Sequence, residues 1–386
     1  MSDYRTLNRT VLAKVETTPG TDAAPTVGAD AIRVEDPKWS SGLQVINTNG
    51  VTGSLDPDAP VPGGGPGNWS GAYNLKGSGA GGTAPEWGAL LQGCGMAVTT
   101  LAADLTGTAQ AGAAGSITLA AGASGVAIGM VITLTGGAGS GQTRVVSAWN
   151  NTTKVATVHP NWTVTPDATS AYKVYACVVY APASQDLARL TIYDYLHNAS
   201  AAVNSRLSKL VGAAGNCQLT FPNAGLVKAD FNFQGQFVAP ADVAHPGAAT
   251  YDSSRPVAFM GADVSLDGAV AKFNRLSLDL GNEIKAADDP TATFGYAAAA
   301  ITRRRITGRI NPPVALKSVR DVFADFLAGS TRKLWTRYGT AGNGISAFLP
   351  AIAYTGAEDE DLDGLAYEGI PFAAQGSDTG AYLCVY

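Results

Sequence analysis

The sequence predicts a mainly β protein with two tandem copies of one β-barrel or β-sandwich fold, each with a short flanking helix, and a small inserted β-module. Glycine occurs 46 times and proline 20 times in 386 residues, and they separate many short apolar runs. Runs of this kind, with apolar residues at every second position, are typical of strands and turns. Hydrophobic residues make up 46% of the chain, which is enough for a substantial core, and only 15% of residues are charged.

The inserted module is marked by an abrupt change of composition after Thr100. Residues 101–176 carry almost no charge and contain runs such as SITLA, MVITLTG and KVATVHP, separated by turn clusters. Short strands with frequent turn signals predict a small all-β module, Ig-like or similar. We expect its two ends to lie close together and its deletion to be tolerated, because an inserted domain leaves the parent sheet intact.

Outside the insert, one order of elements occurs twice: a strand, a long loop, a strand and a short helix. A repeat of this kind predicts two copies of one fold. The first copy has these elements at residues 31–39, 56–67, 68–77 and 84–93, and the second at residues 274–285, 286–296, 300–310 and 319–329.

The two copies also share a spacing of residues near their ends. The matching residues are Gly225, Leu226 and Phe233 in one copy and Gly364, Leu365 and Phe372 in the other. We therefore divide the chain into a first fold (1–100 and 177–245), the insert (101–176) and a second fold (246–386).

Each predicted helix has recognisable end signals. Thr83 and Glu86 are spaced as a capping box, with Pro85 in the first turn and Gly93 at the stop. The second helix has an apolar face that we expect to cover a sheet. That face consists of Val319, Val322, Phe323 and Phe326.

Four arginines stand close together in this weakly charged chain: Arg303, Arg304, Arg305 and Arg309. In a strand, Arg303 and Arg305 lie on one face and Arg304 on the other, so no single ligand meets all three. We expect ion pairs within the sheet or between subunits, because an arginine fork binds a carboxylate through two hydrogen bonds. The candidate partners are Asp288, Asp289 and the acidic stretch 358–363.

The overall charge argues against a protein that grips nucleic acid. The net charge is −5, whereas tight binding to phosphates depends on many lysines and arginines. Direct contact between the arginine run and phosphate stays open as the alternative.

No motif assembles a catalytic or cofactor site, so we expect a protein that is not an enzyme and binds no cofactor or metal. GSGAGG at residues 77–82 fits G-x-G-x-x-G, but the run before it is polar and no parallel βαβ pattern follows. EDEDLDG at residues 358–364 begins like a calcium loop, yet Ile370 stands where the bidentate glutamate belongs. The alternative of a carbohydrate-degrading enzyme requires two neighbouring carboxylates in a cleft.

The cysteines and the N-terminus indicate a protein that folds in a cytosol. Four widely spaced cysteines, Cys94, Cys177, Cys217 and Cys384, are expected to be buried free thiols. The N-terminus lacks the apolar core of a signal peptide, and no run of about 18 apolar residues occurs. We therefore expect no association with a membrane.

Four stretches carry a resemblance to a known family: VLAKVETTPGTDAAPTVGADAIRV, YNLKGSGAGGTAPEWGALLQGCGM, LSLDLGNEIKAADDP and AITRRRITGRI. Together they resemble the major tail tube proteins of long, flexible-tailed (siphovirus-like) bacteriophages, over most of residues 12–100 and 185–372. The insert is similar to a small β-module of several phage structural proteins.

The resemblance implies a structural virion protein that polymerises as stacked rings into the phage tail tube, the channel for DNA ejection. It implies long hairpins of adjacent subunits that merge into a β-barrel around the channel. Tail terminator, distal tail and tape measure proteins are the implied partners, and DNA passes transiently. The implied location is the virion tail, assembled in the host bacterial cytoplasm.

Two copies of the fold per chain predict trimeric rings with pseudo-sixfold symmetry, because rings of this family commonly contain six folds. Hexameric rings of the whole chain are the alternative. Another virion component, such as a decoration or fibre-type β protein, is the alternative to the tube itself.

Overall fold

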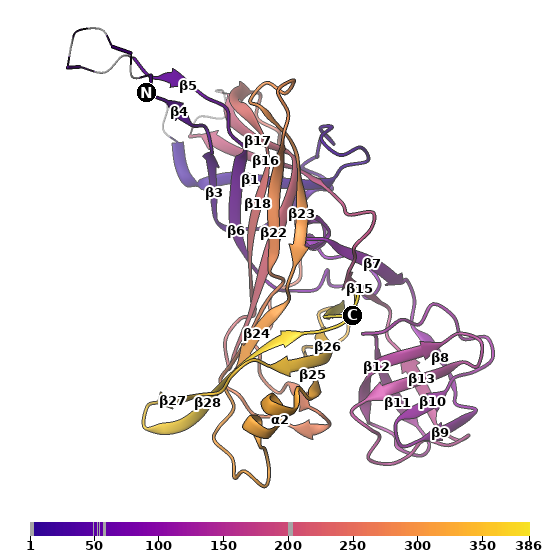
Figure 1. The fold of residues 1–386 in the computed structure, drawn as a ribbon. Coiled ribbons are helices and arrows are strands. Elements are labelled where there is room, and N and C mark those ends of the chain that lie inside the picture. The colour runs from indigo at the N-terminus through magenta and orange to yellow at the C-terminus, as the bar shows by residue number, and fades with distance from the viewer. Residues whose placement is uncertain (1–3, 49, 52, 54, 57–58, 200–203) are drawn as a thin grey trace.

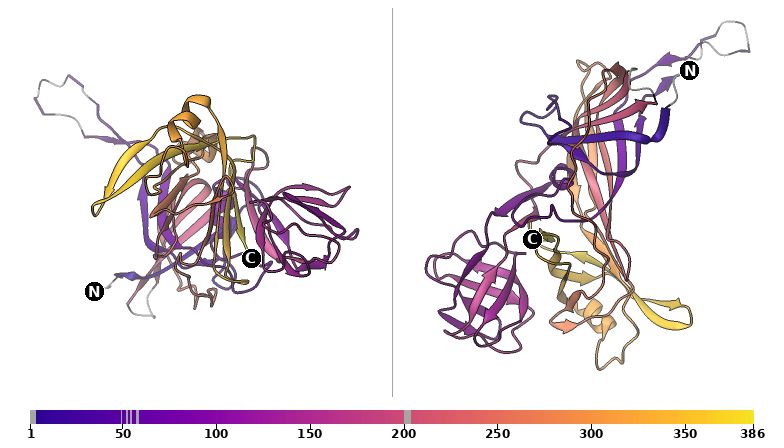
Figure 2. Two further views of the ribbon diagram at one scale, coloured as in Figure 1. Left: turned by 90° about the horizontal axis from the view of Figure 1, so that it is seen from below. Right: turned by 180° about the vertical axis from the view of Figure 1, so that it is seen from behind.

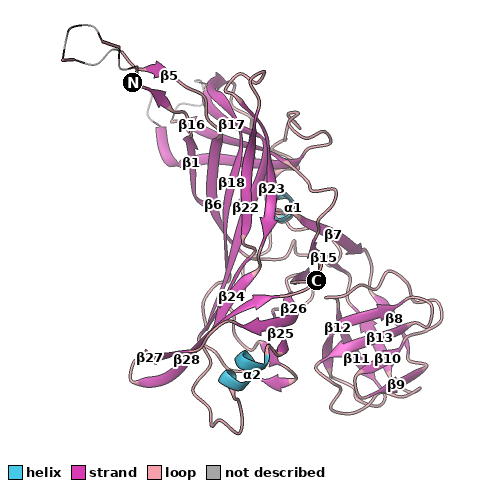
Figure 3. Cartoon of the chain, viewed as in Figure 1, coloured by secondary structure: helices cyan, strands magenta, loops and turns pink. Residues whose placement is uncertain are grey.

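The computed structural model describes residues 4–48, 50, 51, 53, 55, 56, 59–199 and 204–386. These residues form 29 strands and two short helices, which confirms the mainly β class (Figure 3). No sheet of the described chain closes into a barrel on itself.

The first repeat is a seven-stranded antiparallel sheet in the order β2-β1-β16-β17-β18-β6-β3. A helix, α1 (Gly88–Gly93), lies between β6 and β16 in the chain. The strands are β1 (Tyr4–Val15), β2 (Ala31–Ile32), β3 (Glu35–Ser41), β6 (Gly67–Asn74), β16 (Leu190–Asn198), β17 (Ser205–Pro222) and β18 (Lys228–Val243).

The second repeat has the same strand order, β20-β19-β25-β26-β28-β24-β21, again antiparallel throughout. The second helix, α2 (Val322–Ala328), lies between the corresponding strands β24 and β25. The strands are β19 (Asp263–Leu266), β20 (Ala269–Val270), β21 (Arg275–Asp279), β24 (Thr307–Ile310), β25 (Thr331–Tyr338), β26 (Ile345–Tyr354) and β28 (Leu365–Ala374).

A hairpin occupies the same place in each repeat, between its third and fourth strands. The first repeat has β4 (Val45–Ile46) and β5 (Val61–Pro62), and the second has β22 (Asn282–Asp288) and β23 (Tyr296–Arg304). Figure 1 shows the first repeat above the second, with β22 and β23 rising from the second repeat alongside the first.

The insert forms its own seven-stranded sheet, in the order β8-β14-β11-β12-β13-β10-β9. Its ends lie side by side, as expected, because β7 (Met96–Leu101) and β15 (Cys177–Pro182) pair Leu101 with Cys177. The strands are β8 (Leu105–Thr108), β9 (Ala111–Ala113), β10 (Ser116–Thr118), β11 (Val131–Gly136), β12 (Thr143–Asn150), β13 (Val155–His159) and β14 (Ala171–Val174).

The core of the insert continues into the second repeat. Trp335, Phe348 and Tyr382 belong to the same buried cluster as the insert's apolar side chains and are 2%, 0% and 8% exposed. They come from β25, β26 and the C-terminal strand β29 (Tyr382–Val385). Nε2 of His159 in the insert lies 3.3 Å from Oγ of Ser265 in β19, and burial lowers the His159 pKa to about 4. The views in Figure 2 agree that the insert lies beside the second repeat.

This packing predicts a cost for deletion of the insert, whereas the sequence alone predicts that deletion is tolerated. We expect a chain with a short Gly/Ser linker in place of residues 102–176 to lose about 5–9 kcal/mol of stability, because three large apolar side chains become exposed. Urea unfolding followed by circular dichroism measures the loss. The same deletion with Trp335→Thr and Phe348→Thr is the control for aggregation, and a deletion with unchanged stability would contradict the expectation.

Both helices begin differently from the sequence-based prediction. The capping box is wrong: α1 begins after Trp87 with no side-chain cap, and Glu86 makes other contacts. In α2, Asp321 accepts a hydrogen bond from the Ala324 amide, and Gly329 ends the helix with a φ of 61°. The predicted apolar face of α2 is also wrong as a core contact, because Val322 alone is buried in that set. Val319, Phe323 and Phe326 are exposed.

Candidate assembly interface

The two repeats join along one strand edge. β21 of the second repeat pairs with the distal part of β17, with Gln218 opposite Asp279 and Pro222 opposite Arg275. β16 pairs with the other end of β17, from Arg206 to Ala213, so the edge of the distal part is free for β21. The result is one continuous row of strands across both repeats, β3-β6-β18-β17-β21-β24-β28.

The hairpin of the second repeat lies on β17 and β18 of the first. The Ala286 amide donates to Oε1 of Gln234 at 3.2 Å, and Nε2 of Gln236 donates to the Tyr296 carbonyl at 3.4 Å. The rings of Phe294 and Phe237 meet edge to face with centroids 4.7 Å apart. The hairpin is thus held by both polar and aromatic contacts.

Glycine is required where the hairpin comes closest to β17. Gly212 has a φ of 60°, and a Cβ at this position would lie 2.5 Å from Cβ of Ala298. A side chain here would be strained by the backbone and would push the hairpin away. The glycine therefore allows the close approach of the two repeats.

Arg304 ties the hairpin to the first repeat. Its Nη2 donates to the carbonyls of Gly95 and Ala183 at 2.8 and 3.0 Å, and its Nε donates to Oδ1 of Asn282 at 3.1 Å. Burial lowers the pKa of the guanidinium, and the nearby Asp378 carboxylate opposes that effect. These contacts leave the buried head of Arg304 engaged with protein groups.

The other arginines follow the predicted alternation. Arg303 and Arg305 are exposed, whereas Arg304 is half-buried and Ile306 is buried. Nη1 of Arg303 lies 3.8 Å from Oε1 of Glu283, and both side chains are about two-thirds exposed. An ion pair this exposed contributes little to the stability of the fold. All three arginines nevertheless line one cavity of about 430 Å³ together with Ser184 and Asp378, contrary to the expectation that they cannot meet around one ligand.

Arg309 binds the acidic hairpin of the second repeat. Its Nη2 lies 2.7 Å from Oε2 of Glu358, and its guanidinium also contacts Glu360. Both glutamates belong to β27 (Glu358–Leu362), which pairs with β28 across a tight turn at Asp363 and Gly364. The acidic stretch is therefore a strand and turn.

The two aspartates proposed as arginine partners have other roles. Asp289 accepts hydrogen bonds from the amide and hydroxyl of Thr291 at 2.9 and 2.6 Å, and these bonds lower its pKa. Asp288 pairs in the hairpin with Tyr296. Among the described residues, neither aspartate forms an ion pair with the arginine run.

The first repeat has the same edge strand and hairpin as the second, but they contact no other repeat within the described chain. Among the described residues, β3 pairs only with β6, whereas its counterpart β21 uses the second edge to reach β17. The hairpin β4–β5, which corresponds to β22–β23, projects away from the molecule (Figures 1 and 2). Its exposed apolar side chains are Leu43, Val45, Ile46, Val51, Leu55 and Val61.

The opposite end of the chain has a matching free edge. β27 has the same place in the second repeat as the distal part of β17 has in the first. Among the described residues, β27 pairs only with β28. By the register of the filled junction, Lys38 of β3 would face the acidic side chains of β27, Asp359 or Glu360. The charge match between the two free edges is confined to Lys38, because β3 also carries Glu35 and Asp36 and β27 is acidic.

Sequence reasoning missed Gln234 and Gln236 as contact residues. The run FNFQGQF has buried Phe231 and Phe233, and the two glutamines follow on the other face. Their polar face gave no signal of this contact, because the polar face of an antiparallel strand is usually the solvent face.

The structure also places the other sites weighed in the sequence. The loop 77–82 packs on the second repeat, with the Gly79 amide donating to the Gly342 carbonyl at 3.0 Å. All four cysteines are free and buried, as predicted. Within the described ranges, no three His, Cys, Asp or Glu side chains are grouped to hold a metal ion.

Comparison with known proteins identifies no family for this chain. No helix in the described part of the chain has the length and apolar character needed to cross a membrane. Neither a protein-family model nor a curated protein matches the sequence.

Proposed function

We propose that this chain is a structural protein that joins head to tail with copies of itself into closed rings, which stack into a phage tail tube. The junction inside the chain carries the proposal. Inside the chain, β21 and β22–β23 of the second repeat contact the first repeat. The corresponding surfaces, β3 with β4–β5 in the first repeat and β27 in the second, have no such partner among the described residues. A second chain can fill both surfaces by repeating the internal contact.

A contact between two different surfaces is heterologous, and it produces a ring when the rotation closes. The filled junction relates two folds within a chain, and the open junction would relate two folds of adjacent chains. Three chains then supply six similar folds, so the expected ring is threefold by sequence and nearly sixfold in shape.

The charge distribution suits a conduit for DNA. Arg304 and Arg309 are engaged by protein carbonyls and carboxylates, and the net charge is −5. A weakly acidic wall retains few phosphates, so DNA passes without being held. The tail location and the terminator, distal tail and tape measure partners rest on the resemblance described above.

Electron microscopy of the purified, concentrated chain tests the proposal. We expect rods with a central hole, and class averages of end-on views with threefold symmetry and six similar lobes. Rings of six whole chains would contradict the tandem arrangement, and a chain that stays monomeric at every concentration would contradict the function.

A further inference from the structure

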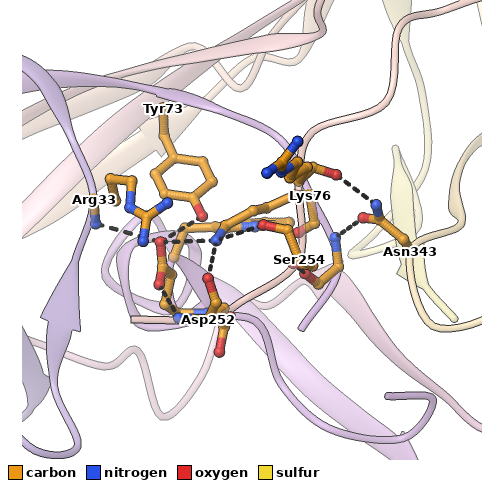
Figure 4. A network of polar contacts seen from close by, with 10 residues as sticks. Arg33, Tyr73, Lys76, Asp252, Ser254 and Asn343 are labelled. Carbon is orange, nitrogen blue, oxygen red and sulfur yellow. Dashed lines mark hydrogen bonds and ion pairs between the residues drawn. The ribbon is translucent and has the colours of Figure 1, made fainter. Parts of the chain in front are cut away.

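A connector without strands, residues 244–262, links β18 to β19 and lies along the first repeat. It is held there by Lys76, whose side chain is 3% exposed. Nζ of Lys76 donates to the carbonyls of Asp252 and Ser254 at 2.8 and 3.3 Å, and it lies 3.5 Å from Oε1 of Glu86 (Figure 4).

Glu86 and Asp252 lock to one another by reciprocal hydrogen bonds. The Glu86 amide donates to Oδ2 of Asp252 at 2.9 Å, and the Asp252 amide donates to Oε2 of Glu86 at 2.8 Å. The hydroxyl of Tyr73 donates to Oε1 of Glu86 at 2.7 Å. The carboxylate of each residue therefore holds the backbone amide of the other.

Asn343 brings the second repeat into the same place. It lies in the turn between β25 and β26, and its Oδ1 accepts from the Gly77 amide at 2.6 Å. Its Nδ2 donates to the Arg255 carbonyl of the connector at 2.6 Å. In Figure 4 the side chain of Asn343 lies at the opposite end of the network from Tyr73 and Arg33. First repeat, connector and second repeat thus meet in one polar network.

The strand pairing of β17 with β21 does not by itself set the angle between the repeats. Neighbouring strands twist by a range of about 10–35° relative to one another, and the apolar core that the repeats share is non-directional. A buried lysine with fixed carbonyl partners is directional, because its hydrogen bonds and its charge are lost when the geometry changes.

We propose that Lys76 and Asn343 are positioning residues that fix the angle between the two repeats and thereby the symmetry of the ring. This rests on the proposed function. An error of about 10° at each of three internal junctions adds to about 30° around the ring, which is enough to prevent closure given the twist range of paired strands.

Asn343→Ala and Lys76→Met test the proposal, and Lys228→Met is the matched control. Lys228 also pairs with a glutamate, Glu35, but both side chains are well exposed, at 39% and 49%. Asn343→Ala removes the link to the second repeat without leaving a buried charge unpaired, so it remains informative if Lys76→Met fails to fold.

Two measurements separate positioning from mere stability. Because the native cysteines are buried, spin labels at Arg206→Cys and Leu327→Cys report the distance between the repeats in the free chain. We expect a single narrow distance distribution in the parent and the Lys228→Met control, and a distribution broadened by several ångströms in Asn343→Ala and Lys76→Met. In micrographs, the two variants should form at least about tenfold fewer closed rings, with arcs of mixed curvature instead.

Unchanged distance distributions together with closed threefold rings in both variants would overturn the positioning role. If the parent chain forms no rings, the proposed function fails, but the distance measurement on the free chain still decides whether Lys76 and Asn343 fix the angle.

Discussion

Replacing Ile46 with aspartate is expected to weaken self-assembly at least about 100-fold and to leave the free chain folded. Ile46 lies in the projecting hairpin opposite Val61, and it is 54% exposed. In the filled junction, the corresponding hairpin packs the half-buried Phe294 against Phe237. Burial of one large apolar side chain contributes about 1.5–3 kcal/mol, and a buried unpaired carboxylate adds a further cost. About 2.7 kcal/mol corresponds to a factor of 100 in affinity.

Val164→Asp is the matched control for this prediction. Val164 is also 54% exposed, but it belongs to the insert rather than to the hairpin. Sedimentation velocity over a range of concentrations gives the assembly threshold of each variant. Equal thresholds for Ile46→Asp and Val164→Asp would show that the hairpin is not part of the contact between chains.

Phe233→Ala and Phe372→Ala are each expected to destabilise the chain by about 3–5 kcal/mol. The two side chains occupy the same place in the two repeats and are 2% and 1% exposed. Each ring fills the space beside a glycine. A Cβ on Gly215 would lie 2.4 Å from the Phe233 ring, and a Cβ on Gly308 would lie 2.3 Å from the Phe372 ring. Truncation of either ring therefore leaves a cavity that no neighbouring side chain fills.

Urea unfolding followed by circular dichroism measures both losses, and Phe323→Ala is the control. Phe323 is 66% exposed on α2, so its truncation should change the free energy of unfolding by no more than about 0.5 kcal/mol. A loss below about 1 kcal/mol for one of the two buried phenylalanines would mean that the repeats are alike in topology but not in the packing of their cores.

The sequence by itself determined the secondary-structure class, the order of elements and the faces of single strands. Alternation of apolar and polar residues is a local property, so it predicts a strand and its buried face wherever the chain pairs. The alternating exposure of Arg303, Arg304 and Arg305 and the position of Phe233 and Phe372 on their strands follow from this alone. The buried thiols follow similarly from residue type and spacing.

Only the tertiary structure decided which segments meet. Glu86 has the spacing of a helix cap, but the amide of Asp252, 166 residues away, donates to its carboxylate instead. Long-range contacts likewise decide that the apolar face of α2 is exposed and that the core of the insert includes Phe348. A periodic pattern shows that a face is apolar, but its partner is chosen by long-range contacts whose entropy of closure depends only weakly on chain separation. Local pattern therefore leaves the partner open, and the packed fold selects it.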